Sequence, residues 1–146
     1  MATEEEALRR LIIELRLLEG TFEELQSRLN LVDAGLMEFK LATTALEGTK
    51  DKKPGSSILV PIGGGSYAKA QLSDSEKVIV GVGAGVAVEK TVDAAKESIR
   101  NRSEELEKVR VAIQQQLVQV AYRMEEVRAK ATEMSSRLTE GEGKSV

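Results

Sequence analysis

The feature that most constrains the fold is a heptad repeat that begins at Leu8. Apolar residues recur in alternating steps of three and four up to Leu46, and Thr43 is the single polar residue among these positions. A repeat of this length predicts a long helix that packs along one seam against a second helix. The seam positions are Leu8, Leu11, Leu15, Leu18, Phe22, Leu25, Leu29, Val32, Leu36, Phe39, Thr43 and Leu46.

A similar repeat in the C-terminal part of the chain predicts the second helix. Thr91 is suited to cap its N-terminus, and the repeat contains two consecutive steps of four at Val109, Ile113 and Leu117, which locally unwinds a supercoil. The predicted seam comprises Val92, Ala95, Ile99, Arg102, Leu106, Val109, Ile113, Leu117, Val120, Met124, Val127, Ala131, Met134 and Leu138.

Four short runs with the composition of β-strands lie between the two repeats. They occupy residues 58–62, 67–72, 77–82 and 86–90 and are separated by turns, two of them rich in glycine, which takes the positive φ of hairpin turns at low cost. The runs predict two hairpins within one small sheet. An even number of antiparallel strands returns the chain to the side from which it came, so the second helix is expected to run back along the first.

These patterns together predict an α+β fold. It consists of a long antiparallel two-helix coiled coil with two central β-hairpins, and both chain termini are expected at the end away from the strands. The predicted parts are a helix over residues 1–48 that ends at Gly48, a loop over 49–57, hairpins over 58–90, a helix over 91–138 and a flexible tail over 139–146.

The glycine-rich segment Val78–Lys90 could also suggest a nucleotide site. A dinucleotide-binding turn needs a third small residue, but Val86 or Val88 occupies that position, and no Lys-Ser or Lys-Thr follows as in a P-loop. The segment is better explained as strand, turn and strand. A nucleotide-dependent enzyme remains the weaker alternative.

Composition narrows the classes of function. The chain has no Cys and no His, so the usual general base and the commonest zinc ligand are missing, and we predict a non-enzyme without catalytic, cofactor or metal sites. A net charge of −3 gives no reason to expect nucleic-acid binding. No apolar run approaches the roughly 20 residues of a membrane span, and Met1–Glu6 is acidic, unlike a signal peptide, so we predict a cytoplasmic protein that does not bind membranes.

Apolar residues outside the seams indicate where partners bind. Ile12, Ile13 and Leu17 should face water and, with their seam neighbours, form a binding patch near the termini. Leu31, Met37 and Leu41 require cover either from another subunit or from the chain's own sheet. The predicted patch comprises Leu8, Leu11, Ile12, Ile13, Leu15, Leu17, Met134 and Leu138.

The strands themselves predict oligomerisation. Open sheet edges rich in Val and Ile invite pairing with other chains unless they are closed into a barrel. The predicted assembly residues are Ile58, Val60, Ile62, Leu72, Val78, Val80, Val82, Val86 and Val88.

The order of helix, two hairpins and helix resembles the alpha-type subunit of prefoldin, of the archaeal kind. The most specific parts of the resemblance are Val60–Ala70 and Val78–Lys90. It implies an ATP-independent chaperone subunit that assembles with beta-type subunits into a hexamer of two alpha-type and four beta-type chains. It further implies an inter-subunit β-barrel built from the hairpins, capture of unfolded client proteins at the coiled-coil tips, and their delivery to a group II chaperonin.

A coiled-coil scaffold or spacer without client binding is the alternative outside the chaperone class. It differs from the chaperone hypothesis at Ile12, Ile13 and Leu17, which a spacer does not require.

Overall fold

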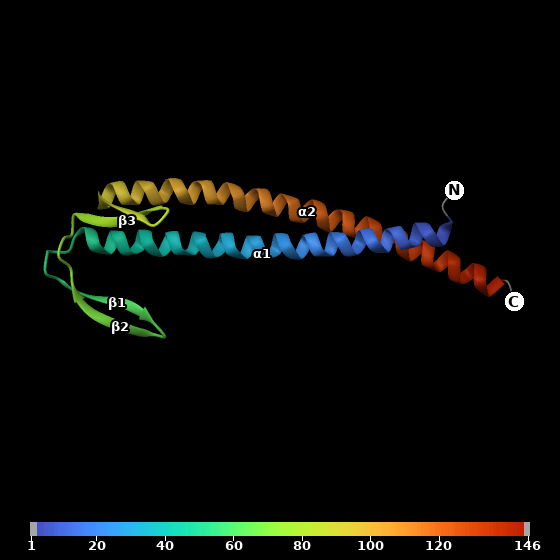
Figure 1. The fold of residues 1–146 in the computed structure, drawn as a ribbon, viewed down its shortest axis with the longest axis horizontal. Coiled ribbons are helices and arrows are strands. Elements are labelled where there is room, and N and C mark those ends of the chain that lie inside the picture. The colour runs from blue at the N-terminus through green and yellow to red at the C-terminus, as the bar shows by residue number, and fades with distance from the viewer. Residues whose placement is uncertain (1–2, 145–146) are drawn as a thin grey trace. The chain divides into compact units, whose positions relative to one another are not determined.

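A computed structural model describes residues 3–144 of the chain, with side chains up to residue 141. The chain divides into two compact units. The terminal unit contains Met1–Asp33 and Lys108–Val146, and the hairpin unit contains Ala34–Glu107. The elements, in chain order, are α1 (Glu4–Lys50), β1 (Ser57–Gly63), β2 (Ser66–Gln71), β3 (Lys77–Gly83), β4 (Val86–Thr91) and α2 (Val92–Lys144) (Figure 1).

The helix starts follow from local capping. The Thr3 hydroxyl oxygen accepts a hydrogen bond from the backbone N–H of Glu6 at 3.2 Å, and Glu4, Glu5 and Glu6 place negative charge at the positive end of α1. The Thr91 hydroxyl oxygen accepts from the backbone N–H of Ala94 at 3.1 Å, which confirms the predicted cap of α2.

Both helices continue beyond their predicted ends. α1 passes through Gly48 to Lys50, because one glycine costs a helix only about 1 kcal/mol and Lys50 is held by Asp93, 3.0 Å from its Nζ. α2 continues through residues 139–144, where a flexible tail was expected. Residues 145–146 of that expected tail lie outside the described part of the chain.

In the terminal unit, α1 and α2 pack antiparallel around a buried cluster. Leu25, Ile113 and Leu117 form its centre, and Val127 is fully buried farther along α2. Ion pairs flank the cluster: Asp33 lies 2.8 Å from Arg110, and Glu14 lies 2.7 Å from Arg123. The half-buried side chains around the centre are Phe22, Leu29, Val32 and Val120.

In the hairpin unit, the first turns of α2 are the most buried. Val92, Ala95 and Ile99 form this core, and Ala95 has no exposed surface. The ion pair between Lys96 and Glu47, at 3.6 Å, joins α2 to the end of α1, and the helices are antiparallel here as well.

The seam of α2 differs from the prediction at two positions. Arg102 is exposed and its guanidinium carbon lies 5.1 Å from the centroid of the Phe39 ring, while its neighbour Ser103 is half-buried. Val109 is also exposed, at 46%. Its neighbour Arg110 is half-buried and occupies the seam position instead, because its charged end reaches Asp33. The consecutive steps of four therefore fall at residues 95, 99 and 103 rather than at 109, 113 and 117.

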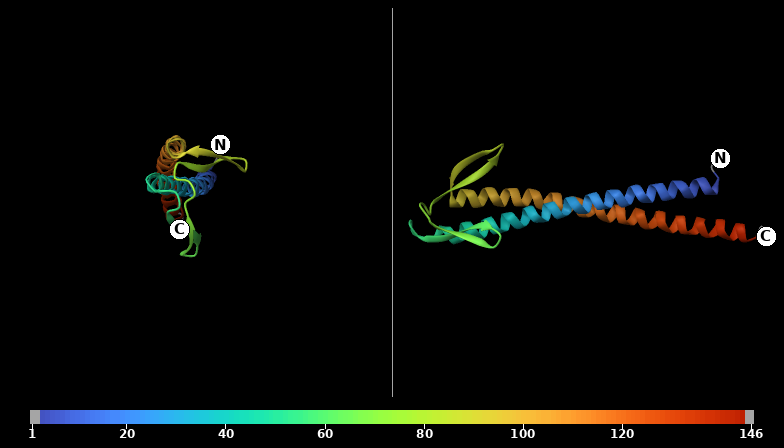
Figure 2. Two further views of the ribbon diagram at one scale, coloured as in Figure 1. Left: turned by 90° about the vertical axis from the view of Figure 1, so that its left-hand side faces the viewer. Right: turned by 60° about the horizontal axis from the view of Figure 1, so that its bottom comes forward.

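The strands form two separate two-stranded sheets, so the prediction of one small sheet was wrong. The connection between β2 and β3 has its own hydrogen bonds, since one Asp74 carboxylate oxygen accepts from the backbone N–H groups of Glu76 and Lys77. This turn leads β3 away from β2, and the two hairpins extend in different directions within the hairpin unit (Figure 2). The predicted helix pair and hairpins are otherwise confirmed.

The two hairpins repeat one structure at an offset of twenty residues. Ser57 pairs with Gln71 as Lys77 pairs with Thr91, and each first strand carries a bulge before its turn, between Pro61 and Gly63 or between Gly81 and Gly83. Both turns have positive φ at their two central residues, which is the geometry of a type I′ turn. The φ values are 58° and 74° at Gly64 and Gly65, and 51° and 74° at Ala84 and Gly85.

Candidate binding surfaces

The predicted terminal patch divides into seam residues and residues outside the seam. The five seam members are half-buried between α1 and α2 in the terminal unit, so they are accessible along their edges only. These are Leu8, Leu11, Leu15, Met134 and Leu138.

The two sides of this seam differ in chemistry. On one side, Leu8, Ile12 and Leu15 line a shallow groove together with one arginine and several small side chains of α2. We call this the apolar groove; its other lining residues are Arg128, Ala131, Thr132, Ser135 and Ser136. Small apolar and hydroxyl side chains leave room there for the side chains of another protein.

The opposite side of the seam is charged. Arg10, Glu14, Lys130, Glu133 and Arg137 line it beside Leu11 and Met134. A hydrogen bond from Arg137 to Glu133, 2.7 Å away, raises the pKa of the Arg137 guanidinium above its ordinary value. These charges surround the accessible edges of Leu11 and Met134.

Ile13 and Leu17 form a third feature, which we call the apolar ridge. They are 58% and 68% exposed, and their spacing of four residues places them next to each other on α1. Ile12 is 39% exposed and lines the groove instead, so the three residues that the sequence grouped together belong to two surfaces.

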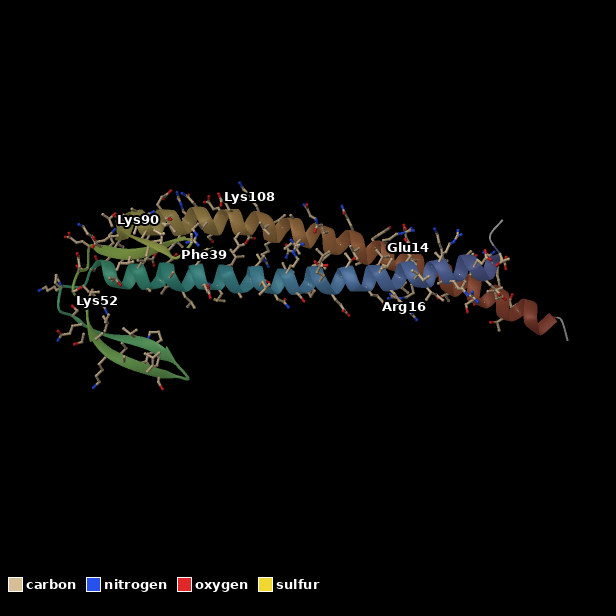
Figure 3. All side chains as sticks on the ribbon, viewed as in Figure 1. Glu14, Arg16, Phe39, Lys52, Lys90 and Lys108 are labelled. Carbon is tan, nitrogen blue, oxygen red and sulfur yellow. The ribbon has the colours of Figure 1, made fainter. Side chains whose placement is uncertain are left out.

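Arg123 holds the helices together beside these surfaces. Its guanidinium donates to Glu14 and to Glu126 on its own helix, at 2.8 and 3.1 Å. These hydrogen bonds, the one to Glu14 first, raise the pKa of Arg123 above its ordinary value. Figure 3 shows the side chains of both helices in this region, with Glu14 labelled.

The hairpins present a second apolar surface. Among the predicted assembly residues, Ile58, Leu72, Val78, Val80 and Val88 are half-buried within the chain. The remaining four, Val60, Ile62, Val82 and Val86, are exposed.

Three exposed residues of the hairpin surface were not predicted from the sequence. Leu59 and Ile79 are 64% and 78% exposed, and they occupy the same place in the twenty-residue repeat; Tyr67, on β2, is also exposed. Alternation along each strand was the available signal, because neighbours of inward-facing residues point to the other face. Each hairpin thus has apolar side chains on both faces.

The chain's own strands do not cover two further apolar residues of the hairpin unit. Met37 and Leu41 are 56% and 62% exposed, so packing on the chain's own sheet is wrong for these two residues. Leu31, in the terminal unit, is also more than half exposed.

The described residues contain neither a candidate metal site nor a candidate membrane span. Residues 3–141 contain no group of three or more Asp or Glu side chains placed to hold a metal ion. No described helix has the length and hydropathy that a membrane span requires. The candidate sites are the exposed apolar surfaces: the apolar groove, the apolar ridge and the hairpins.

Comparison with known proteins places the chain among relatives of one kind. The profile of the family described as "Prefoldin subunit" matches residues 18–137. The chain is 39% identical over 113 residues to prefoldin subunit alpha of Methanopyrus kandleri, covering 77% of this chain and 72% of that one. It is 32% identical over 140 residues to prefoldin subunit alpha of Pyrococcus horikoshii, covering 94% and 93%.

A solved structure shows the same fold. The structure of filamentous PFD from Methanocaldococcus jannaschii contains a chain that superimposes with a TM-score of 0.67. The sequence identity is 22%, and the match covers 79% of this chain and 95% of that chain.

Proposed function

The chain belongs to the prefoldin family and is a chaperone subunit, and on this premise we propose that it is an ATP-independent holdase subunit that captures unfolded proteins at the terminal unit. In this proposal the apolar groove and the apolar ridge contact the client. The captured protein is then delivered to a group II chaperonin in the cytoplasm. The observation that carries the proposal is the exposure of Ile13 and Leu17, at 58% and 68%, which packing between α1 and α2 does not require.

The chemistry of these surfaces suits clients without a fixed shape. The groove walls of Ala131, Ser135 and Ser136 leave space for varied side chains. On the other side of the seam, Met134 adds a flexible side chain that adapts to different partners. Each contact is small, so tight capture requires several subunits to act on one client. Surrounding charges, such as Arg10, Lys130 and Glu133, keep the exposed apolar area soluble.

Assembly with other prefoldin subunits brings together the several client-binding surfaces that capture requires. We infer that the hairpins pair with beta-type subunits in a hexamer of two alpha-type and four beta-type chains, and that they close a β-barrel there. Exposed Leu59, Ile62 and Ile79 would be buried in such a barrel. Strand edges left unpaired within each two-stranded sheet would find hydrogen-bond partners on neighbouring chains.

The test is an aggregation assay with a thermally or chemically unfolded client protein in buffer without ATP. The chain assembled with beta-type subunits should suppress light scattering by the client, and an added group II chaperonin with ATP should then recover folded client. Unchanged aggregation would contradict the holdase, and suppression that depends on added nucleotide would contradict the ATP-independent mechanism.

The coiled-coil spacer is separated from the holdase by the same assay. The hexamers for this test contain beta-type chains whose own client-binding ends have been inactivated. In such hexamers a spacer would still assemble through its hairpins but would leave client aggregation unchanged. Protection that remains with such chains comes from this subunit.

A further inference from the structure

The terminal unit carries a second heptad stripe on α2, separate from the seam. Val111, Gln115, Val118 and Tyr122 follow one another in steps of four, three and four. At 3.6 residues per turn these positions lie on one face of the helix. Val118 and Tyr122 are 67% and 72% exposed, and Val111 and Gln115 are exposed as well.

This stripe lies on the side of α2 opposite to α1. The buried seam residues Ile113 and Leu117 are two positions along from Val111 and Gln115, which turns them by about 200° around the helix. Lys108, at the start of the stripe, projects from α2 on the side that faces away from α1 (Figure 3). Packing between α1 and α2 therefore does not explain these apolar side chains.

Charge is absent along the stripe and present at its two ends. No charged residue occurs between Arg110 and Arg123, and these two arginines form ion pairs with Asp33 and Glu14 of α1. On the stripe itself, the next positions outward are Lys108 and Glu125, both exposed. The stripe thus has a cation at one end and an anion at the other.

Such a stripe is complementary to itself in the antiparallel direction. When a second copy is turned by 180°, Val111 lies opposite the second copy's residue 122, and Gln115 lies opposite residue 118. The same rotation places Lys108 opposite residue 125, so an ion pair forms at each end. A parallel pairing would instead place like charges opposite each other, which is unfavourable.

We propose that this stripe is a docking site for the α2 helix of a second copy of this chain, bound antiparallel through the stripe formed by Lys108, Val111, Gln115, Val118, Tyr122 and Glu125. Heptad spacing identifies the occupant as a helix, since steps of four and three match the knobs-into-holes packing of two helices. The charges at the ends select a second copy in antiparallel orientation. This contact goes beyond assembly through the hairpins.

The contact is weak and depends on concentration. From residue 111 to residue 122 the helix rises about 17 Å, or three turns. Two such faces bury less than the roughly 1,000 Å² that distinguishes stable protein interfaces from weak ones. Cross-linking detects such a contact better than a measurement of particle size does.

Cysteine cross-linking provides a clean test because the natural chain contains no cysteine. The variants Val111→Cys and Tyr122→Cys are prepared separately in the full chain assembled with beta-type subunits, mixed and mildly oxidised. A disulfide requires Cα atoms within about 7 Å. The antiparallel pairing therefore predicts a mixed dimer between the two variants and no dimer from either variant alone, since identical positions lie about 17 Å apart along the axis.

A control pair and a charge reversal complete the design. Arg16→Cys and Ser27→Cys, exposed on α1 and also eleven residues apart, should give no mixed dimer above background. In the 111 and 122 cysteine backgrounds, Lys108→Glu or Glu125→Lys introduced into both chains should lower the mixed-dimer yield at low salt several-fold, and both changes together should restore it.

Three outcomes would overturn the proposal. Dimers of each variant with itself would indicate parallel pairing. No mixed dimer at any concentration would mean that a second copy does not occupy the stripe. A mixed-dimer yield that is insensitive to both charge reversals would show that charge complementarity does not orient the contact. No client protein is present, so these outcomes are independent of the holdase assay.

Discussion

Gly35 allows α1 and α2 to approach closely beside Leu106. A Cβ atom at residue 35 would lie 3.0 Å from Cδ2 of Leu106, closer than carbon atoms normally pack. Gly20, on the same helix, has no neighbour within 4 Å of the corresponding position. In α1, Gly35 therefore leaves space for close packing against α2, whereas Gly20 has no such role.

This contrast predicts unequal responses to the same substitution. Gly20→Ala should raise the free energy of unfolding by about 0.5–1 kcal/mol, because alanine favours a helix over glycine. Gly35→Ala should give a smaller gain or a loss, and Gly35→Val should destabilise by about 1–3 kcal/mol through overpacking against Leu106. Denaturant unfolding followed by helical circular dichroism measures both. An equal gain at the two glycines would show that the contact at Leu106 yields without cost.

The two hairpin turns offer a reciprocal test. Ala84 has a φ of 51°, and Gly64 occupies the equivalent place with a φ of 58°. A left-handed conformation costs an L-residue about 1–2 kcal/mol, and glycine loses part of this advantage through its larger unfolded-state entropy. Ala84→Gly should therefore slow amide hydrogen exchange in β3 and β4, and Gly64→Ala should accelerate it in β1 and β2. Changes in the same direction at both turns would contradict the shared geometry.

Client capture should depend on the groove and the ridge separately. Each Ile or Leu contributes up to about 1.5–3 kcal/mol where a client fully buries it. The double variant Ile13→Asp with Leu17→Asp removes the ridge, and the single variant Ile12→Asp alters the groove. The triple variant should lose more protection in the aggregation assay than the double or the single variant. The melting temperature should change by a few degrees at most, because all three side chains are exposed.

Val109→Asp is the matched control for this prediction. Val109 lies in the same unit and is 46% exposed, but it belongs to neither surface. It should leave capture unchanged. In the decisive hexamers, every alpha-type chain carries the triple substitution and the client-binding ends of the beta-type chains are inactivated. Full protection of the client by these hexamers would refute the placement of the client site.

Assembly should be lost when a charge is placed on the hairpin surface. Ile79 is 78% exposed, so Ile79→Asp should leave the isolated chain folded, but burial of its carboxylate in a barrel would cost several kcal/mol. Light scattering should report smaller particles with helical circular dichroism retained. Val80→Asp should have a similar effect with some loss of chain stability, because Val80 is half-buried. A hexamer that persists with Ile79→Asp would exclude this face from the interface.

The ion pair between Lys50 and Asp93 predicts a dependence of stability on alkaline pH. The hydrogen bond to Asp93, followed by its charge, raises the pKa of Lys50 above the ordinary value of 10.5. The stabilisation is therefore complete below pH 10.5 and is lost as the pH rises through the folded-state pKa. The stability difference between the parent and Lys50→Met should stay constant up to about pH 10 and shrink above it. A difference that grows with pH would contradict the assignment; both side chains are largely exposed, so the effect is small.

The sequence by itself determined the helices, the seam of α1 and the two hairpins. All twelve predicted seam residues of α1 are buried or half-buried, because a heptad repeat defines one face of a helix without reference to anything else. The cap at Thr91 and the glycine-rich turns could also be predicted from the sequence, since capping and positive φ depend on residues close in the chain.

Only the tertiary structure decided how those elements meet. The seam of α2 passes through Ser103 and Arg110 because Arg102 lies over Phe39 and Arg110 reaches Asp33, and both contacts involve residues far apart in the chain. Likewise, Ile12 lines the groove while Ile13 and Leu17 form the ridge, since only the position of α2 determines which side chains it covers. A local pattern specifies the face of an element, and the partner that packs on it determines which of its edges remain open.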